Sequence, residues 1–510
     1  MEQWKKGAGK PGARAFEHAQ HSKTSDHPFS LISKTVCEHR RSEEARLPEG
    51  VGVHAPGASG ARNDVYLQRQ TSVESNARAY PRRLPIALVS GRGITVRDAD
   101  GREYIDCLAG AGALALGHNH HVVVEAIKRA LDAEVPLQTL DLPTPLKDRF
   151  TGSLFDSLPA HCLDQFKIHF CGPSGSDAVE AALKLARTAT GRKGVIAFDG
   201  AYHGMTQSAM SLMGDIEPKT GIGASLVDVQ FMPFPSEYRC PFGLGSGAGA
   251  TASANYLGRL LEDPHAGAPR PAAIIVEIVQ GEGGVNPAPD GWLRRVREIA
   301  SRQGVLLIVD EVQTGLGRTG RLYAFEYAGI VPDILVLSKA IGGGLPLAVI
   351  LYRRDLDVWR PGAHAGTFRG NQLAFAAGAA VVEHVVRERL DKRAELAGER
   401  LQNALERLAE DVLCIGHVRG RGLMRGVEIC ASSDRRASAG NPPRPAPEMS
   451  RRIQQECLRR GLIVELGGRS GSVVRFLPPL IVSLSEIDEI AGRFGEAVKA
   501  AEASREAHSA

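Results

Sequence analysis

Long hydrophobic runs are missing from this sequence of 510 residues, and none approaches the roughly 20 apolar residues that a membrane-spanning helix requires. The first residues, MEQWKKGAGKPGARAF, lack the apolar segment of a secretory signal. A large charge of one sign is also missing, since the formal net charge is +4 with acidic and basic residues interspersed. These absences argue against a membrane anchor, secretion and nucleic acid as a partner, so we expect a cytoplasmic protein.

Paired cysteines are missing as well. The 8 cysteines form no CxxC pair, and the 16 histidines do not cluster at metal-ligand spacing. We therefore expect reduced, mostly buried thiols, no disulfide framework and no metal site. Aromatic residues make up only 5% of the chain, beside 43% hydrophobic and 24% charged residues, which is still typical of a globular protein. A chain of this length predicts a large domain with at least one smaller one.

Composition and periodicity divide the chain into four segments. Residues 1–65 are rich in Gly, Ala, Ser and His without sustained periodicity, which predicts a disordered extension or a short arm docked on the body. Residues 66–144 include ITVRDADGREYIDC, a predicted β-hairpin that turns at Asp98–Gly101. Residues 145–370 alternate between strand and helix patterns, and residues 371–505 open with a long helical stretch. We predict a large α/β domain over 145–370 and a small α+β domain built from the two flanking segments.

Three short apolar runs carry the fold prediction for the large domain. They are Ala272–Val279, Val305–Asp310 and Ile334–Leu337. Such runs suit strands that are buried on both faces of a parallel sheet. Between the first two, WLRRVREIASRQG predicts a crossover helix that ends at Gly304, so we expect helices on both faces of the sheet. Two segments rich in Gly, Ser or Pro, 243–254 and 431–447, predict surface loops.

Chemically active residues stand where these strands end, and ligands of open parallel sheets bind at that edge. Asp310 closes one run, Lys339 follows another after one serine, and Glu277 lies in the third. Since a buried ammonium is costly, Lys339 is either a snorkelling lysine or the anchor of a cofactor held as a Schiff base. Asp310 could cap the next turn, or hold a protonated pyridine nitrogen. FDGAYHG places Tyr202 and His203 after a further strand, where an aromatic ring can stack on a cofactor or fill the core.

A phosphate site is predicted by CGPSGSDAVEAALKLARTATG, a Gly- and Ser-rich turn that enters an amphipathic helix. Ser174 is the expected N-cap, with Asp177 in capping-box position. The free N–H groups of Gly175 and Ser176, at the positive end of the helix dipole, would hold a dianion. A capped helix that binds no ligand is the alternative.

Four elements follow one another along the chain: the Gly- and Ser-rich turn, the FDGAYHG segment, and the strand ends at Asp310 and Lys339. In this order they resemble the class III aminotransferases of the fold-type I pyridoxal-phosphate superfamily, over about residues 66–483. The most specific stretches are LLIVDEVQTGLGRTG and PDILVLSKAIGGGLP. The resemblance implies pyridoxal 5′-phosphate as cofactor, an amino donor and a 2-oxo acid as substrates, and a homodimer with shared active sites. It also implies individual roles: Lys339 as Schiff-base lysine and proton shuttle, Asp310 as partner of the pyridine nitrogen, Gln313 as neighbour of the ring hydroxyl, Gly175 and Ser176 as the phosphate turn, Tyr202 as the stacking aromatic, and Thr367 as the residue that reaches the phosphate of the neighbouring subunit's cofactor.

Two further matches concern the substrate. Glu282 in IVQGEGG is similar to the family's gate glutamate, and Arg475 in VVRFLPPL to the arginine that this gate covers. The resemblance implies that the gate opens when Arg475 holds the α-carboxylate of glutamate or 2-oxoglutarate, because arginine binds a carboxylate bidentately. A structural ion pair without gating is the alternative.

Finer similarity points to one branch of the family. QTSVESNARAYPRRLPIAL, DCLAGAGALALGHNH and HAGTFRGNQLAFAAG resemble the diaminobutyrate–2-oxoglutarate aminotransferases. That branch implies a ping-pong reaction in which glutamate and aspartate 4-semialdehyde give 2-oxoglutarate and 2,4-diaminobutyrate, for siderophore or diamine synthesis. The alternatives are aminotransferases for ornithine, 4-aminobutyrate, acetylornithine or ectoine-pathway diaminobutyrate, and a non-catalytic cofactor-binding protein. Departures from the family pattern at Pro173, Asp177, His121 and Gln372 concern loop geometry, not a reacting group.

Overall fold

The computed structural model describes residues 62–220, 228–245, 247–431 and 442–509. Most of the predicted extension, residues 1–61, lies outside this range. Helix α1 (Arg62–Val73) begins before residue 65, where we expected the extension to end. The Asn63 amide donates to Asp98 Oδ2 and Asp100 Oδ2 at 2.9 and 2.8 Å, and these contacts hold the start of α1 against the body. Residues 62–65 therefore belong to a helix, and the limit of the extension as a whole stays a prediction.

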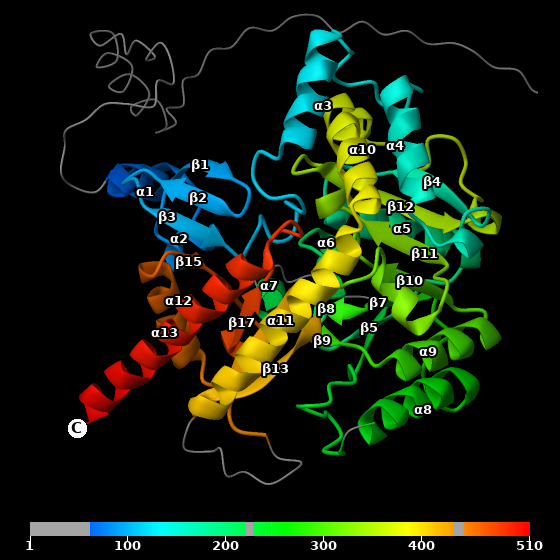
Figure 1. Ribbon diagram of the computed structural model, residues 1–510. Coiled ribbons are helices and arrows are strands. Elements are labelled where there is room, and N and C mark those ends of the chain that lie inside the picture. Colours follow the sequence, from blue (N-terminus) through cyan, green and yellow to red (C-terminus); the bar gives the residue numbers. More distant parts are fainter. Residues whose placement is uncertain (1–61, 221–227, 246, 432–441, 510) are drawn as a thin grey trace, which may run out of the picture. The chain divides into compact units, whose positions relative to one another are not determined.

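A central sheet of seven strands forms the large domain (Figure 1). In spatial order its strands are β4 (Phe166–Phe170), β12 (Val349–Arg353), β11 (Ile334–Leu337), β10 (Leu306–Asp310), β7 (Ala273–Glu277), β5 (Val195–Phe198) and β6 (Val229–Met232). Neighbours from β11 to β6 are parallel, and β12 runs antiparallel to both β11 and β4. The prediction of a mostly parallel α/β domain is confirmed, including the three strands expected from the apolar runs.

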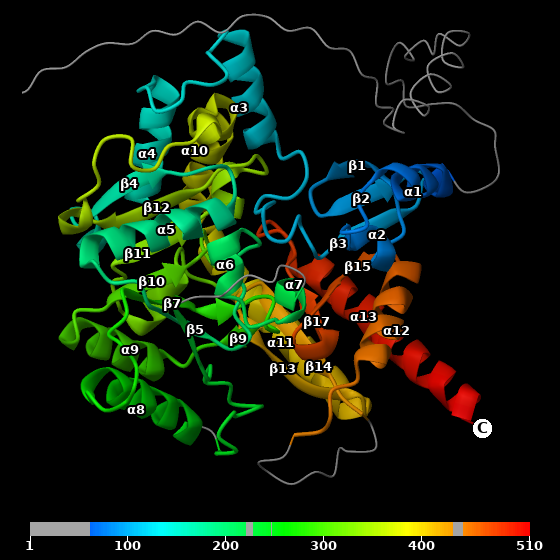
Figure 2. The same ribbon diagram turned by 180° about the vertical axis from the view of Figure 1, so that it is seen from behind.

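Both faces of this sheet are buried, as the continuous apolar runs predicted. Along β10, Leu306 and Ile308 pack into one hydrophobic cluster, and Leu307 and Val309 pack into another. This alternation follows from the period of two of a strand. Helix α5 (Gly175–Thr190) supplies the first cluster, and it packs along β11 and β12 (Figure 2). The second cluster contains residues of the predicted crossover helix, which is α9 (Asp290–Arg302), and of the helices α8 (Ala248–Glu262) and α10 (Gln372–Arg387).

Helix α8 corrects the prediction of a surface loop over 243–254. The helix begins at Ala248, and Gly249, Ser253 and Ala254 are buried in it. Its small residues permit close packing: a Cβ at Gly249 would lie 2.3 Å from Cys240 Sγ, and Ser253 Oγ accepts a hydrogen bond from Trp292 Nε1. The Gly- and Ser-rich composition that suggested a loop therefore reflects tertiary packing. Of the other predicted loop, residues 432–441 lie outside the described range, and α12 (Pro447–Arg459) starts at its last residue.

The small domain joins the two ends of the chain in one sheet. The predicted hairpin is confirmed as β2 (Thr95–Asp98) and β3 (Glu103–Asp106). Its sheet is completed by β1 (Leu88–Arg92) and by β15 (Leu462–Ile463), which pairs with β3 in parallel. A second sheet contains β13 (Ile415–Arg421), β14 (Met424–Ile429), β17 (Val473–Phe476) and β16 (Glu465–Gly467), and a two-stranded one contains β8 (Val279–Gln280) and β9 (Asn286–Pro287).

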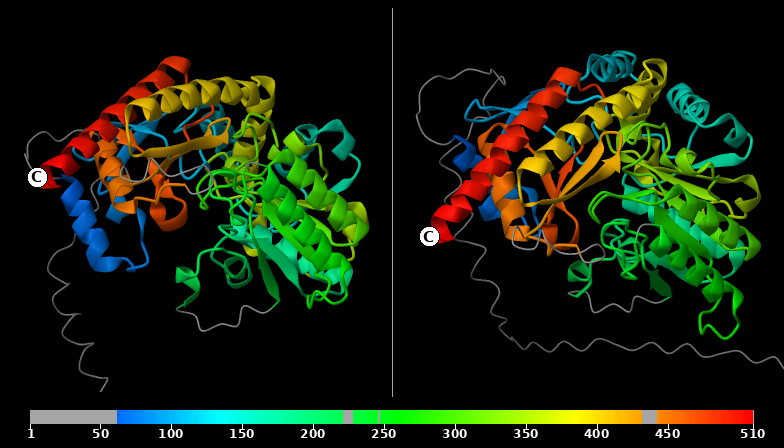
Figure 3. Two further views of the ribbon diagram at one scale, coloured as in Figure 1. Left: turned by 90° about the horizontal axis from the view of Figure 1, so that it is seen from below. Right: turned by 60° about the horizontal axis from the view of Figure 1, so that its bottom comes forward.

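The long helical stretch after Asn371 divides into α10 and α11 (Leu390–Asp411) at Arg389, whose φ is 51°. Figure 3 shows α11 beside α13 (Leu484–Ser509), which it contacts. Helices α3 (His121–Asp132) and α4 (Pro145–Asp156) both pack on α10. The short helices are α2 (Tyr80–Arg83), α6 (Gln207–Ser211) and α7 (Glu217–Thr220). Because all described residues fall in one compact unit, the domain limits given above remain predictions.

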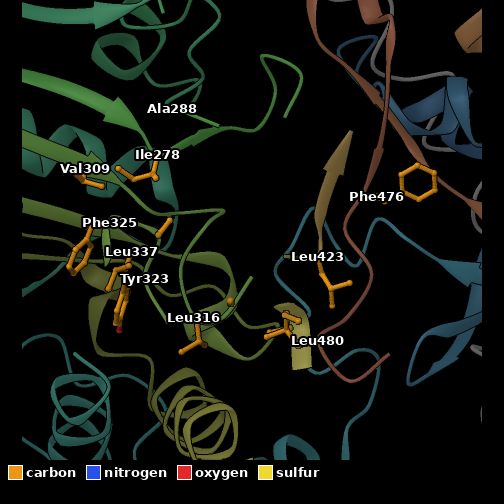
Figure 4. Close-up of a cluster of buried hydrophobic side chains, with 14 of the residues drawn as sticks. Ile278, Ala288, Val309, Leu316, Tyr323, Phe325, Leu337, Leu423, Phe476 and Leu480 are labelled. Carbon is orange, nitrogen blue, oxygen red and sulfur yellow. The ribbon is translucent and has the colours of Figure 1, made fainter. Parts of the chain in front are cut away.

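One apolar core connects the central sheet to the C-terminal sheet (Figure 4). Val309 and Leu337 of the central sheet belong to the same cluster as Leu423 and Phe476 of the C-terminal part. Within it, the buried guanidinium of Arg318 donates to carbonyl oxygens of that part. This shared core fixes the strands that carry the site residues against each other. Among the described residues, no helix is long and apolar enough to cross a membrane.

Candidate functional site

A cavity of about 160 Å³ opens where β7, β10 and β11 end. Its lining includes eight residues that the sequence predicted for the site: Gly175, Ser176, Tyr202, His203, Glu282, Asp310, Gln313 and Lys339. Three other predicted residues do not line it: Ser174, Thr367 and Arg475. Residues from five separate segments thus converge on one cavity at the carboxyl edge of the sheet, where α/β proteins bind ligands.

Lys339 follows β11 in a left-handed backbone conformation, with φ of 49°. A lysine rarely adopts this region, and such strain is typical of functional sites. Ser338 Oγ donates to the carbonyl of Leu347 at 2.9 Å and fixes the residue before it. Burial lowers the pKa of the Lys339 ammonium, although the nearby carboxylates of Glu282 and Asp310 act in the opposite direction. A lowered pKa is what an amine needs to act as a nucleophile and a proton carrier.

Asp310 closes β10 and is almost fully buried. Its Oδ2 lies 2.8 Å from Nδ1 of His203, and its Oδ1 accepts a hydrogen bond from the backbone N–H of Val312 at 3.0 Å. Burial alone would lower the pKa of His203, but the hydrogen bond and the charge of Asp310 outweigh it and raise the pKa. The other ring nitrogen, Nε2, is buried and has no partner among the described residues. The carboxyl group of Asp310 therefore stands in the cavity wall with the His203 ring held against it.

Glu277 is a site residue whose role the sequence did not reveal. It ends β7 and lies beside Asp310 in the parallel register. One carboxylate oxygen accepts from the N–H of Tyr202 and the other from the N–H of Gly281, both at 2.9 Å. Burial raises its pKa to about 7. The carboxylates of Glu277 and Asp310, at the ends of neighbouring strands, therefore hold Tyr202 and His203 respectively at the cavity.

The start of α5 confirms the predicted capping box. Ser174 Oγ accepts from the N–H of Asp177, and the Asp177 carboxylate accepts from Ser174 in return. Gly175 and Ser176, the first two helical residues, face the cavity. Gly204, with φ of 117°, has to be glycine, because a Cβ there would lie 2.0 Å from Ser176 Oγ. The loop after β5 thus lies directly against the helix start.

Gln313 lies on the turn after β10. Its Nε2 donates to the carbonyl of Ala111 at 3.2 Å. Its Oε1 is buried and has no partner among the described residues, although it faces Gly281 closely. The amide is therefore oriented with one polar atom left for a ligand.

Arg475, on β17, lies behind Glu282 and is 1% exposed. Its Nη2 is 2.8 Å from Glu282 Oε1, so the predicted pair does form. A second carboxylate, Glu465 of β16, lies 3.0 Å from the same nitrogen. Glu465 was not predicted from the sequence, because its antiparallel register with Arg475 becomes visible only once β16 and β17 are paired. Nε and Nη1 of Arg475 have no hydrogen-bond partner among the described residues, so a fully buried guanidinium keeps unused donors.

Thr367 lies outside the cavity, on an exposed helical turn, Thr367–Gly370. Phe368 beside it is 60% exposed. The carbonyl of Gly370 accepts from the N–H of Thr139, which brings the exposed segment Leu137–Leu142 against this turn. Within a single chain, Thr367 therefore does not lie at the cavity.

The residues fit a phosphorylated pyridine aldehyde on the evidence of their chemistry. A helix start with free N–H groups suits the phosphate, a buried carboxylate at Asp310 suits a ring N–H, and Lys339 is the amine that an aldehyde requires. Two buried polar atoms, Nε2 of His203 and Oε1 of Gln313, have no partner within the part of the chain that the structure describes. Among the described residues, no group of three or more His, Cys, Asp or Glu side chains is placed to hold a metal ion.

Comparisons with known proteins agree with this geometry. The family model described as "Aminotransferase class-III" matches residues 77–498. A diaminobutyrate–2-oxoglutarate aminotransferase of Rhizobium meliloti is 57% identical over 437 residues, covering 86% of this chain and 93% of that protein. A protein of the same name from Haemophilus influenzae is 50% identical over 438 residues, covering 86% and 96%. The crystal structure of the ornithine aminotransferase from Toxoplasma gondii matches with a TM-score of 0.73 and 28% identity, covering 88% and 97%.

Proposed function

Because the chain belongs to the class III aminotransferase family, whose members use pyridoxal 5′-phosphate, we propose that it transfers an amino group between 2,4-diaminobutyrate and 2-oxoglutarate. Aminotransferase chemistry and its cofactor follow from family membership. The choice of substrates is supported by the names of relatives that share half or more of their residues with this chain. The observation that carries it in the structure is the Glu282–Arg475 pair beside the cavity.

The cavity residues would each have a distinct task. When bound, the cofactor supplies an electron sink for the charge left on a substrate carbon that loses a proton. Lys339 would form the covalent attachment and carry the proton, and Asp310 would keep the ring nitrogen protonated. Gly175 and Ser176, with the neighbouring N-cap Ser174, would hold the phosphate. Tyr202, His203 and Gln313 would contact the ring, since all three line the cavity.

The gate would let one pocket accept two unlike substrates. With Glu282 on Arg475, the charge of the guanidinium is balanced and an aminomethyl group can approach. With Glu282 turned away, the unused donors of Arg475 can hold a carboxylate bidentately. Ion pairing keeps the Arg475 guanidinium charged in its buried position. Burial alone would lower the pKa of Arg475, but the carboxylates of Glu282 and Glu465 outweigh it and raise the pKa. Arg475 therefore stays charged and able to recognise an anion.

The experiment that tests the substrates is a panel of single half-reactions with the holoenzyme. 2,4-Diaminobutyrate, ornithine, 4-aminobutyrate and β-alanine are mixed separately with the enzyme, and the loss of the absorbance of the lysine-bound cofactor is followed. We expect 2,4-diaminobutyrate to give the highest rate per concentration. A better rate with any of the others would overturn the substrate assignment and leave the aminotransferase class intact.

Replacing Arg475 by alanine should damage the two half-reactions unequally. The variant loses the group that holds the glutamate carboxylate, so kcat/KM for glutamate should fall by about 10²-fold, as expected for a charge-assisted hydrogen-bonded contact. The half-reaction with 2,4-diaminobutyrate should change much less, because Glu282 covers Arg475 there. Stopped-flow absorbance of both half-reactions measures the split. Equal losses would show that Arg475 is structural.

A second copy of the chain would complete the site. Leu137, Leu140, Leu142 and Phe368 are 56%, 52%, 63% and 60% exposed and belong to the segments that meet at the Thr367 turn. An exposed apolar patch of this kind marks an interaction surface. We infer a homodimer in which Thr367 approaches the phosphate site of the partner subunit, as the family resemblance implies. The proposed substrates are water-soluble metabolites, and a cytoplasmic location remains our prediction.

Placing a charge in this patch should separate the subunits. The double variant Leu142→Glu, Phe368→Glu is expected to shift from a dimer to the 54.5 kDa chain in sedimentation velocity and to lose activity in parallel. The matched control is Leu396→Glu on α11, since Leu396 is equally exposed at 62% and lies on another element. A variant that stays dimeric would place the interface elsewhere.

A further inference from the structure

The buried guanidinium of Arg475 is shared by two carboxylates, only one of which has an assigned role. Glu465 Oε2 lies 3.0 Å from Arg475 Nη2, with side-chain exposures of 6% and 1%. Glu282 Oε1 lies 2.8 Å from the same nitrogen, and its side chain is 38% exposed. One partner is therefore buried with the arginine, and the other reaches it from the cavity side.

The two carboxylates differ in their freedom to move. Glu465 is the cross-strand neighbour of Arg475 in the ladder of β16 and β17, and its side chain is only 6% exposed, so its packed surroundings leave it little room to turn away. The phenol of Tyr80 also lies close enough to act on this carboxyl, whose pKa it lowers against the effect of burial. Apart from its pair with Arg475, Glu282 is held among the described residues through its main chain, whose carbonyl accepts from the N–H of Gly468 at 2.8 Å. The side chain of Glu282 can turn away, whereas that of Glu465 stays.

A fixed partner matters because a buried cation without a counter-ion is very unfavourable. In the proposed reaction, Glu282 leaves Arg475 before the carboxylate of glutamate takes its place. If Glu282 were the sole partner, Arg475 would be uncompensated during every exchange. Arg83, a further cation near Glu465, is exposed, so water screens its charge.

We infer that Glu465 is a standing counter-ion, a positioning residue that keeps Arg475 neutralised and in place while Glu282 and the substrate carboxylate exchange. The inference rests on the proposed function and goes beyond it, since it assigns a residue that acts through Arg475. It also gives a task to Tyr80, which belongs to the segment ESNARAYPRRLP that distinguished the branch in the sequence. Tyr80 acts on the carboxyl of Glu465, which in turn forms the ion pair with Arg475.

The test is Glu465→Gln in the holoenzyme, with both half-reactions followed by cofactor absorbance. For glutamate, kcat/KM should fall at least about tenfold, because opening the gate now leaves Arg475 unpaired. For 2,4-diaminobutyrate it should stay within about twofold, because Glu282 remains on Arg475. Glu489→Gln on the exposed face of α13 is the control for loss of an ion-paired glutamate, since Glu489 pairs with Arg493. Equal loss in both half-reactions, or no loss in either, overturns the inference.

A double-mutant cycle sharpens the result. In a Glu282→Gln background no carboxylate has to leave, so adding Glu465→Gln should cost far less of the glutamate rate than it does alone. Additive losses would contradict a role in exchange. If Glu465→Gln does not fold, Tyr80→Phe keeps the ion pair and removes one contact to it. That variant should show a smaller loss confined to glutamate, and a loss shared by both donors would contradict the inference.

The wild-type enzyme separates the two proposals. If it prefers another amine donor, the substrate assignment fails, and the selective effect on glutamate can still be measured with that donor. If it prefers 2,4-diaminobutyrate and Glu465→Gln is not selective, only the standing counter-ion is refuted.

Discussion

Replacing Lys339 by alanine should lower the overall transamination rate by at least about 10³-fold, within the range that a positioned acid–base group contributes. The variant loses the side chain that we propose to bind the cofactor covalently and to carry the proton. Lys339→Arg should fail equally, since a guanidinium keeps the charge but cannot form an imine and does not release its proton. The left-handed backbone at Lys339 belongs to the turn and should persist in both variants.

Two measurements check this independently of activity. Borohydride reduction followed by mass spectrometry should find the cofactor attached to wild type at Lys339 and to neither variant. The absorbance band of the bound cofactor should shift in both variants. Lys167→Ala serves as the control, because Lys167 forms an ion pair with Asp357 at the surface end of β4. Covalent cofactor on another lysine of the wild type would refute the assignment.

Replacing Asp310 by asparagine should lower kcat by about 10²–10³-fold, the usual loss for one preorganised electrostatic contact in a water-excluded site. The amide keeps the shape and can still accept from the N–H of Val312, but it cannot hold a protonated ring nitrogen. Asp333→Asn is the matched control. Asp333 is equally buried but pairs with Arg297 and Arg353 at the opposite end of β11, so its loss should lower stability and leave kcat nearly unchanged.

The same substitution should reverse the pKa shift of His203. With Asp310 present, the hydrogen bond and the charge raise that pKa above its ordinary value. Without them, burial dominates and favours the neutral ring, so the pKa should fall below the ordinary value. Folded-state stability that depends on protonated His203 is present at low pH and is lost as pH rises through its raised pKa. In Asp310→Asn the sign reverses: with the pKa below the ordinary value, the contribution is present above the ordinary pKa and is lost as pH falls through the lowered one. Titration of the His203 ring by NMR measures the reversal, and an unchanged pKa would contradict the pairing.

Much of the site could be predicted because its residues stand at strand ends. Asp310 and Lys339 are readable from apolar runs, since each run stops where the sheet meets the cavity. The capping box at Ser174 follows from local spacing and is confirmed. Such features depend on residues close in sequence, so the sequence alone determines them.

The parts that escaped prediction depend on tertiary pairing. The role of Glu465 depends on its place opposite Arg475 in the ladder. The role of Glu277 depends on the backbone N–H of Tyr202, which comes from a loop 75 residues away, together with that of nearby Gly281. The prediction of a surface loop over 243–254 was wrong for a related reason. Its glycines and serines signal a turn locally, but close packing against Cys240 and Trp292 makes their small size an advantage in a helix.

The parallel pairing of β15 with β3 has a consequence for synthesis on the ribosome. Beside these strands, Arg102 donates to the carbonyl of Arg459, 357 residues later in the chain. At roughly 5–20 residues per second, the N-terminal hairpin waits for on the order of tens of seconds before its partner strand emerges. During that time β3 is an open sheet edge, which is where nascent chains associate wrongly. Arg475 on β17, which we propose to bind the substrate carboxylate, is translated later still, so the sheet edge and the proposed substrate site are completed in the same final stage of synthesis.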